Sequence, residues 1–221
     1  MQHIGIDRAL FIAHKMRDEF IYNMAKAEGN SLTFAEMQTV INGISIGGKP
    51  MFELHQVEHI RDGWNALIAQ VKAQRFEVSK DNFIYLNSIV AEGENPETGG
   101  FRTRPVSITG TAYSPPLPML LAEKYRDMMQ AYEQAADYRK GFVLFLHTAR
   151  NQYFADGNKR TGQLMMNGEL MMQGYPPITI SPSQDTRYRD ELLRYYESGE
   201  AAAMEAFLID CANQPRYAVM Y

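Results

Sequence analysis

One segment in the second half of the chain limits the folds it can adopt more than any other. Residues 161–174, TGQLMMNGELMMQG, place apolar side chains on more than one side at helical spacing. A helix that is apolar around most of its circumference must be covered by other elements, so we expect residues 157–173 to form a buried central helix. The segment before it, GFVLFLHTARN, is nearly all apolar and predicts another helix.

Most of the remaining chain also repeats apolar residues three or four positions apart, which is typical of amphipathic helices. Thr33 is a candidate N-cap for a helix that carries Phe34, Met37 and Ile41. We therefore expect an all-α fold in one compact unit of 221 residues. Further helices are predicted at residues 7–27, 52–74, 80–91, 119–136, 186–198 and 201–213.

One segment departs from this pattern. Residues 92–110, EGENPETGGFRTRPVSITG, begin with the Pro, Asn and Gly residues of a loop. FRTRPVSITG then has the β-branched alternation of a short strand or hairpin. Pro105 favours an edge position because it cannot donate to a sheet ladder. We expect a short β-hairpin here, in an otherwise helical chain.

Composition excludes several classes of protein. Apolar residues make up 45% of the chain, but no apolar run approaches the roughly 18 residues that span a bilayer, so we expect no membrane insertion. The first residues lack the uninterrupted apolar region of a signal peptide, which predicts a cytoplasmic protein, or a secreted effector without a cleaved signal peptide. A net charge of −4 argues against general nucleic-acid binding. The single cysteine, Cys211, excludes an internal disulfide and is expected to be buried.

The start of the predicted central helix has the features of a phosphate site. Backbone N–H groups at a helix N-terminus lack helical partners and the helix dipole favours an anion, so we expect a phosphate to settle against Gly157 and Asn158. Lys159 and Arg160 place cations in the first turn, where they oppose the dipole unless an anion is bound. Asp156 offers an oxygen ligand for Mg²⁺ beside that anion. The alternative is that Asp156 only caps the helix and both cations are solvated.

Residues 150–162, RNQYFADGNKRTG, resemble the signature of the Fic/Doc (Fido) family, His-Pro-Phe-x-Asp/Glu-Gly-Asn-Gly/Lys-Arg, which is followed by a second Arg after two intervening residues. The match covers Phe154, Asp156, Gly157, Asn158 and Arg160. Three further segments resemble, in order, the flap hairpin, the helix after it and the exit from the central helix of this family: GGFRTRPVSITG, YSPPLPMLLAEKYRDMM and LMMQGYPPITI.

The resemblance implies the Fic fold, a helical bundle around a central helix with a short β-hairpin flap. It implies a single Fic-like domain over residues 1–221, with a Fic core at 80–213 and an N-terminal helical region at 1–45. In that region AKAEGNSLT, which contains Glu28, resembles the end of the inhibitory helix of N-terminally regulated members. Glu28 would be the inhibitory residue.

Family members mostly transfer AMP from ATP to a hydroxyl of a target protein, and Doc-like members transfer a phosphoryl group. By resemblance, Asp156 would hold Mg²⁺, and Gly157 and Asn158 would cradle the phosphates of ATP. Arg160 would contact the outer phosphates. Lys159 replaces the commoner glycine, which is a Doc-like feature.

The flap, roughly residues 100–106, would bind the target protein. Pairing of an extended target segment with this edge would be β-augmentation. An ordinary surface hairpin is the alternative interpretation, and the oligomeric state cannot be inferred from these residues. The flap residues that would contact the target are Gly100, Phe101, Arg102, Thr103 and Arg104.

Two departures from the signature bear on activity. The catalytic position holds Gln152 in place of His, and an amide cannot accept a proton at neutral pH, which costs typically about 10²–10⁴-fold in rate. Gln163 replaces the second arginine, so it could still hydrogen-bond a phosphate of the nucleotide but adds no charge. Glu28 thereby loses its usual partner, and Met24 stands where the inhibitory motif has Ser or Thr. We expect a weak or inactive AMP transferase. A non-catalytic Fic pseudoenzyme that binds nucleotide or partner, or a Doc-like phosphoryl transferase, is the alternative.

Histidines elsewhere offer competing interpretations. His147 lies five residues before Gln152 and on another helix face, so a core role is favoured over a relocated base. HQVEH, with His55, Glu58 and His59, fits an inverted zinc-peptidase pattern, for which a distant Glu133 could add a ligand. The same helix has ordinary core spacing, which favours chance placement of the two histidines.

Overall fold

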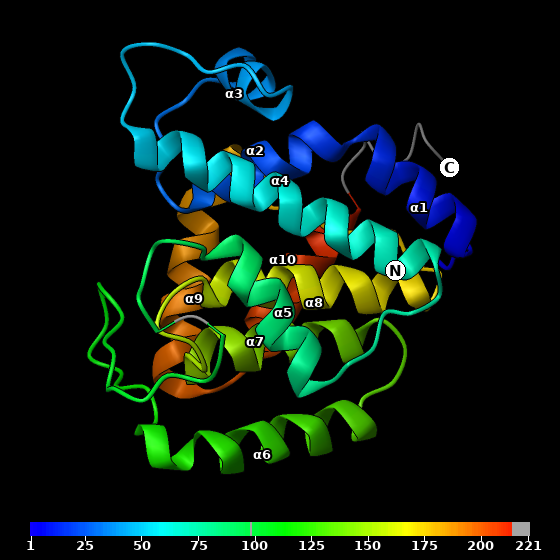
Figure 1. Ribbon diagram of the computed structural model, residues 1–221. Helices are drawn as coiled ribbons and strands as arrows, with labels where there is room; N and C mark the ends of the chain where they lie inside the picture. Colours follow the sequence, from blue (N-terminus) through cyan, green and yellow to red (C-terminus); the bar gives the residue numbers. More distant parts are fainter. Residues whose placement is uncertain (98, 214–221) are drawn as a thin grey trace.

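The structure of the protein is a computed structural model that describes residues 1–97 and 99–213. Within these ranges its regular structure is helical, and no strand is formed (Figure 1). In chain order the helices are α1 (Ile6–Lys15), α2 (Arg17–Ala27), α3 (Phe34–Ile41), α4 (Met51–Lys72), α5 (Lys80–Val90), the 3₁₀ helix η1 (Pro118–Leu120), α6 (Leu121–Gln134), α7 (Arg139–Asn151), α8 (Asn158–Met172), the 3₁₀ helix η2 (Pro182–Gln184), α9 (Asp185–Ser198) and α10 (Ala202–Ala212).

Helix α8 is the central helix that the sequence predicts. Every one of its residues except Lys159 and Met172 is buried. Helix α7 lies directly against it, with glycines at the contact. A Cβ atom on Gly162 would lie 3.2 Å from the backbone oxygen of Phe145, so a larger residue would push the two helices apart by a few tenths of an ångström.

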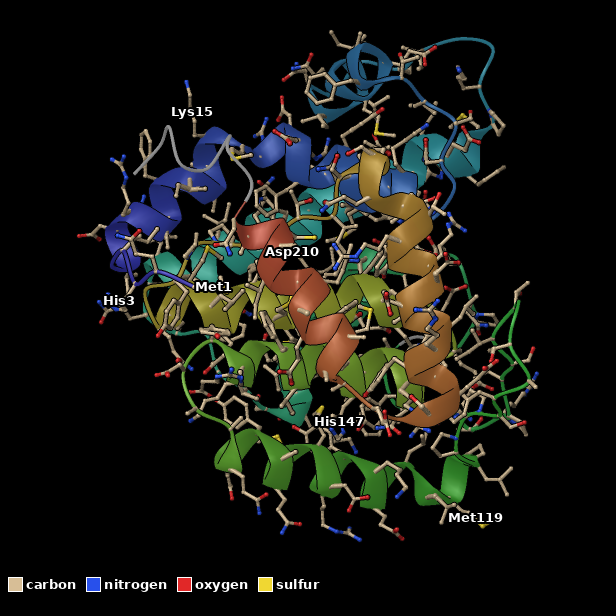
Figure 2. The ribbon with its side chains drawn as sticks, turned by 180° about the vertical axis from the view of Figure 1, so that it is seen from behind. Met1, His3, Lys15, Met119, His147 and Asp210 are labelled. Atoms are coloured by element: carbon tan, nitrogen blue, oxygen red, sulfur yellow. The ribbon has the colours of Figure 1, made fainter. Side chains whose placement is uncertain are left out.

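Two clusters of buried apolar side chains explain why α8 is apolar on more than one side. Leu164 and Met165 pack into the larger cluster, with the N-terminal helices, α4 and α5. Met166 and Leu170 pack into a second cluster, with α7, α9 and α10. Figure 2 shows α10 lying across α7 and α8 on the face opposite to α4. The all-α class predicted from the periodicity is confirmed.

The predicted helix at residues 7–27 is interrupted at Met16, which separates α1 from α2. Trp64 of α4 causes the difference: its indole stacks on Phe20, with ring centroids 4.5 Å apart. The indole Nε1 donates to the backbone oxygen of Ala13 over 3.3 Å. In a continuous helix that oxygen would accept from Arg17, so a side chain from a distant helix replaces the bond lost at the break.

The predicted cap at Thr33 is confirmed. Its hydroxyl accepts from the backbone N–H of Glu36 over 3.3 Å, and the Glu36 carboxylate accepts from the backbone N–H of Thr33 over 2.7 Å. This reciprocal pair is a capping box, so the beginning of α3 is set by residues three positions apart.

The expected β-hairpin does not form, and residues 99–117 make an irregular loop that we call the flap loop. Its backbone is satisfied by a side chain instead of a ladder. Arg102, only 2% exposed, donates to the carbonyl oxygens of Gln152, Arg104 and Pro116 over 2.6, 2.8 and 2.5 Å. The strand prediction was wrong because the alternation of residue types does not reveal that Arg102 would be buried and would bond these carbonyl oxygens.

Two further expectations from the sequence concern membrane insertion and the single cysteine. No helix in the described ranges has the length and apolar character needed to cross a membrane. Cys211 is buried in α10, as predicted, and burial raises the pKa of its thiol to about 12.

Candidate nucleotide site

The turn between α7 and α8, residues 152–157, is shaped by two left-handed positions. Gln152 ends α7 with φ 49° and ψ 61°, and Gly157 precedes α8 with φ 72°. A Cβ atom on Gly157 would lie 2.8 Å from Cβ of Ala91. Asn87 of α5 holds the same turn, because its Nδ2 donates to the backbone oxygen of Asp156 over 2.9 Å. The turn is therefore packed directly against the end of α5, and only glycine fits.

Asn158 organises the inside of this turn. Its Oδ1 accepts from the backbone N–H of Phe154 over 2.9 Å, and its Nδ2 donates to the Phe154 oxygen over 2.8 Å. The same Nδ2 donates to Oε1 of Gln152 over 3.0 Å. The Asn158 side chain is buried and fully used, so it shapes the turn and is not free to bind a ligand.

The backbone at the beginning of α8 is open to an anion. Within the described part of the chain, the N–H groups of Asn158, Lys159 and Arg160 donate to no acceptor, whereas Thr161 already donates to the oxygen of Gly157. Unpaired N–H groups and the helix dipole make such a terminus attractive to a phosphate.

A cavity of about 560 Å³, which we call the nucleotide cavity, opens in front of this turn. Its volume is within the size range of small-molecule sites. Gln152, Asp156 and Lys159 line one side of it, and helix α9 and the flap loop line the rest. The polar corner at Asp156 and Lys159 faces apolar side chains, an arrangement suited to a flat ring with a phosphate tail. The lining from the flap loop and α9 consists of Ser107, Ile108, Thr109, Gly110, Arg189, Leu192, Leu193 and Tyr196.

The cations at this cavity are held by carboxylates. The Nζ of Lys159 lies 3.3 Å from Oε1 of Glu28, which ends α2. Arg189 is exposed and pairs with Asp185 over 2.8 Å on the same helix. Because Glu28 is largely buried whereas Asp185 lies at the surface, the first pair constrains its lysine more strongly.

Arg160 lies behind the cavity and does not line it. Its guanidinium is 1% exposed and donates to both carboxylate oxygens of Glu94, to the Val90 oxygen over 2.5 Å and to Asp156 over 3.3 Å. These partners belong to the end of α5 and the loop after it. Arg160 thus fastens α8 to α5, and its geometry is that of a structural ion pair.

Gln163 is also absent from the cavity. Its side chain is 3% exposed, and its Nε2 has no hydrogen-bond partner among the described residues. The structure therefore brings Gln152, Asp156 and Lys159 together at the cavity. It places the side chains of Asn158, Arg160 and Gln163 in the packed interior behind it.

The flap residues named from the sequence lie outside this cavity, and the following segment of the flap loop, residues 107–110, lines it instead. Phe101 packs on Tyr153 with ring centroids 5.0 Å apart. Thr103 and Arg104 are exposed, and both contact Glu97. The apolar positions of α9 had no distinguishing signal, because ordinary amphipathic spacing also describes a helix that only packs.

Asp156 has the chemistry of a Mg²⁺ ligand. Its side chain is 50% exposed at the cavity, and Oδ1 accepts from the backbone N–H of Gly157 over 2.6 Å. Its Oδ2 has no hydrogen-bond partner among the described residues. Mg²⁺ typically binds one or two carboxylates together with substrate phosphates, so the position fits.

The competing histidines are not at this site. His147 lines a separate cavity and has no place at the lining that contains Gln152. The rings of His55 and His59 are nearly parallel with centroids 6.2 Å apart, and His59 lies 3.9 Å from Glu92. The described residues contain no group of three His, Cys, Asp or Glu side chains arranged to hold a metal.

Known proteins agree with this fold. A family model described as Fic/DOC matches residues 77–170. The protein adenylyltransferase Fic of Drosophila willistoni is 25% identical over 203 residues, which is 89% of this chain and 40% of the relative. Its counterpart in Drosophila grimshawi is 26% identical, with 89% and 41% covered. The chain spans about two fifths of the length of these curated relatives.

Solved structures give the same result for the fold. A Fic domain containing signaling protein from Bacteroides thetaiotaomicron aligns with a TM-score of 0.77 at 18% identity, over 96% of this chain and 88% of that chain. Fic-1 from C. elegans aligns with a TM-score of 0.75 at 20% identity, over 94% and 69%.

Proposed function

We propose that this chain binds ATP with Mg²⁺ as a Fic-type transferase, a proposal supported by the match of residues 77–170 to the Fic/DOC family model and by the similarity to protein adenylyltransferases. We further propose that AMP transfer to a hydroxyl of a target protein is weak or absent in the chain as it stands. The observation that carries this proposal is the position of Gln152, which lines the nucleotide cavity where a general base would have to act.

The amide of Gln152 is already used within the turn. Its Nε2 donates to the backbone oxygen of Ala149 over 2.6 Å, and its Oε1 accepts from Asn158 over 3.0 Å. An amide oxygen does not take up a proton at neutral pH, whatever its orientation. A target hydroxyl in this cavity would therefore keep its proton, and the rate would lack the contribution of about 10²–10⁴-fold that a positioned base supplies.

The remaining features of the cavity support nucleotide binding. The apolar side chains of α9 and Ile108 offer surfaces for a flat ring. The unpaired N–H groups at the start of α8 and the Lys159 ammonium favour the phosphates. Mg²⁺ held by Asp156 would neutralise charge on the phosphates. These groups are enough for the pseudoenzyme hypothesis, in which the chain binds the nucleotide without transferring AMP.

Glu28 supports a regulatory role at the same site. Its carboxylate lies 3.3 Å from Lys159, so it occupies the cation that a phosphate would otherwise use. From the sequence, Glu28 was expected to lack a partner because Gln163 replaces the second arginine. Lys159, four positions earlier on α8, takes the place of that partner. We propose that Glu28 competes with the nucleotide phosphates for Lys159.

The target would approach the exposed part of the flap loop. Thr103 and Arg104 are exposed there, but the backbone N–H of Thr103 already donates to Glu97 over 3.0 Å. Pro105 has no N–H to offer. Pairing of a target strand with this segment would therefore require Glu97 to release Thr103, which makes β-augmentation a rearrangement and not a simple docking.

Phosphoryl transfer is the second candidate, because Lys159 lines the cavity at the position where most family members have glycine. A lysine near the outer phosphates would favour transfer of the terminal phosphoryl group. The position of the radioactive label separates the two chemistries, since AMP transfer carries the α-phosphate and phosphoryl transfer carries the γ-phosphate.

The test uses the full chain with a cell lysate and ATP labelled at either the α- or the γ-phosphate, next to Gln152→His and the amide control Gln152→Asn. Lysate without the chain gives the background from endogenous kinases. Above it, we expect no additional labelled protein with the unchanged chain or with the control, and α-label transfer with Gln152→His. Calorimetry with ATP and Mg²⁺ should detect binding in all three. Strong α-label transfer by the unchanged chain would refute inactivity. Strong γ-label transfer would establish the second candidate.

A further inference from the structure

A second cavity of about 230 Å³ lies between α6, α7 and the end of α9, and it shares no lining residue with the nucleotide cavity. Figure 2 shows His147 at this place, on the side of α7 that faces α6. Lys124 from α6 and Arg150 from α7 bring two cations to its wall. Nothing in the proposed transferase chemistry uses these residues.

Arg150 is held in a fixed orientation with its end groups unused. Its Nε donates to the backbone oxygen of Tyr196 over 3.1 Å, and its guanidinium carbon lies 4.5 Å from the ring centroid of Tyr113. On the other side is Gly199, where a Cβ atom would lie 3.3 Å from that carbon. Both Nη groups lack a hydrogen-bond or ion-pair partner among the described residues. A planar fork held this way is prepared for an oxyanion.

The hydroxyl of a tyrosine adds a second unused group. Tyr195 is 5% exposed and lines the cavity, yet its hydroxyl makes no hydrogen bond within the described part of the chain. The hydroxyl is therefore free to donate a hydrogen bond to a ligand in the cavity. Lys124 lies at the same cavity, positioned by Asp127 over 2.8 Å.

The charges at the cavity favour an anion. Lys124 is paired with Asp127 over 2.8 Å and with Glu123, which is not a lining residue, over 3.7 Å, so the uncompensated positive charge at the cavity is that of Arg150. The pKa of His147 is lowered chiefly by burial, with Asp127 acting against the shift and the two cations adding to it. His147 therefore offers a neutral ring at pH 7, able to donate or accept one hydrogen bond.

The size of the cavity and the directions of its hydrogen-bond donors indicate the class of ligand. The cavity is smaller than the roughly 300 Å³ at which drug-sized ligands begin to fit. A carboxylate would be satisfied by the Arg150 fork alone, whereas Lys124 and Tyr195 approach from two other helices. Three directions of donation suit a tetrahedral group with several acceptor oxygens. We propose that this cavity binds a phosphate group, either as inorganic phosphate or as a small phosphate monoester.

Calorimetry on the full chain tests this proposal, with inorganic phosphate and glycerol 2-phosphate titrated at constant ionic strength set by chloride. The parent for all variants is Lys159→Gln, which weakens phosphate binding in the nucleotide cavity. Arg150→Gln should weaken binding about tenfold or more, because a charge-assisted hydrogen bond is lost. Arg139→Gln is the matched control on the same helix, 50% exposed and paired with Glu205, and it should leave the affinity unchanged.

Tyr195→Phe guards against misfolding, because it removes only a hydroxyl that has no partner. We expect its melting temperature to equal that of the parent and its phosphate affinity to fall about fivefold. Tighter binding of inorganic phosphate would identify the free anion as the ligand, and tighter binding of glycerol 2-phosphate would identify an ester. Equal affinity in the parent, Arg150→Gln and Tyr195→Phe, or heat no larger than that of added chloride, would overturn the proposal.

Discussion

The ion pair between Arg160 and Glu94 gives the sharpest test of how this site is built. Arg160 is 1% exposed and the Glu94 side chain is 24% exposed, so the guanidinium is shielded from water and the carboxylate is partly shielded. Glu94→Gln would remove the negative charge and one of the two acceptor oxygens, and the guanidinium would keep one amide oxygen, the Val90 oxygen and a longer contact of 3.3 Å to Asp156.

Breaking a buried pair from one side typically costs about 3–5 kcal/mol. The remaining partners and the partial exposure of Glu94 reduce this, and we expect about 2–3 kcal/mol. For a chain of this size that corresponds to a fall of roughly 4–12 °C in melting temperature. Glu205→Gln is the matched control, because Glu205 pairs with a half-exposed Arg139 over 3.6 Å and should cost no more than about 1 kcal/mol.

Thermal and urea unfolding measure the effect, and ATP binding is measured on the same samples. If Arg160 were held in reserve for nucleotide phosphates, Glu94→Gln would cost little stability and would raise the affinity for ATP. That outcome would refute a structural role for the pair. A loss of stability with weaker or unchanged ATP binding would support it.

Two other substitutions test the same turn. Glu28→Gln removes the carboxylate 3.3 Å from Lys159, so we expect a severalfold rise in ATP affinity by calorimetry, and unchanged affinity would contradict competition at Lys159. Gly157→Ala should lower the free energy of unfolding by about 2–4 kcal/mol, because its Cβ would lie 2.8 Å from Ala91 in addition to the strain of φ 72°. Gly43→Ala, with φ 80° and open space around it, isolates the backbone strain at about 1 kcal/mol, and equal losses at both glycines would disprove the packing argument.

The sequence was informative wherever a property is carried by neighbouring residues. The apolar circumference of residues 161–171 required a buried central helix, and α8 is that helix. Thr33 and Glu36, three positions apart, form the expected capping box. The unpaired N–H groups at the beginning of α8 also follow from its local geometry alone.

Contacts between distant residues could not be read in the same way. Trp64 decides where the first long helix is interrupted, across 51 positions of the chain. Arg102 replaces the expected hairpin by bonding three carbonyl oxygens itself. The prediction of a strand failed because a local alternation of residue types contains no information about a buried arginine that satisfies the backbone.

The turn at residues 152–157 contains both kinds of determinant. The amino-acid sequence by itself determined that a glutamine occupies the place of a base, since no fold can make an amide accept a proton at neutral pH. Only the tertiary structure decided that Arg160 faces Glu94 in the interior while Lys159 faces the cavity and Glu28. Adjacent residues on a helix point about 100° apart, so the packing of α8 against α5 determines which of the two cations can meet a phosphate.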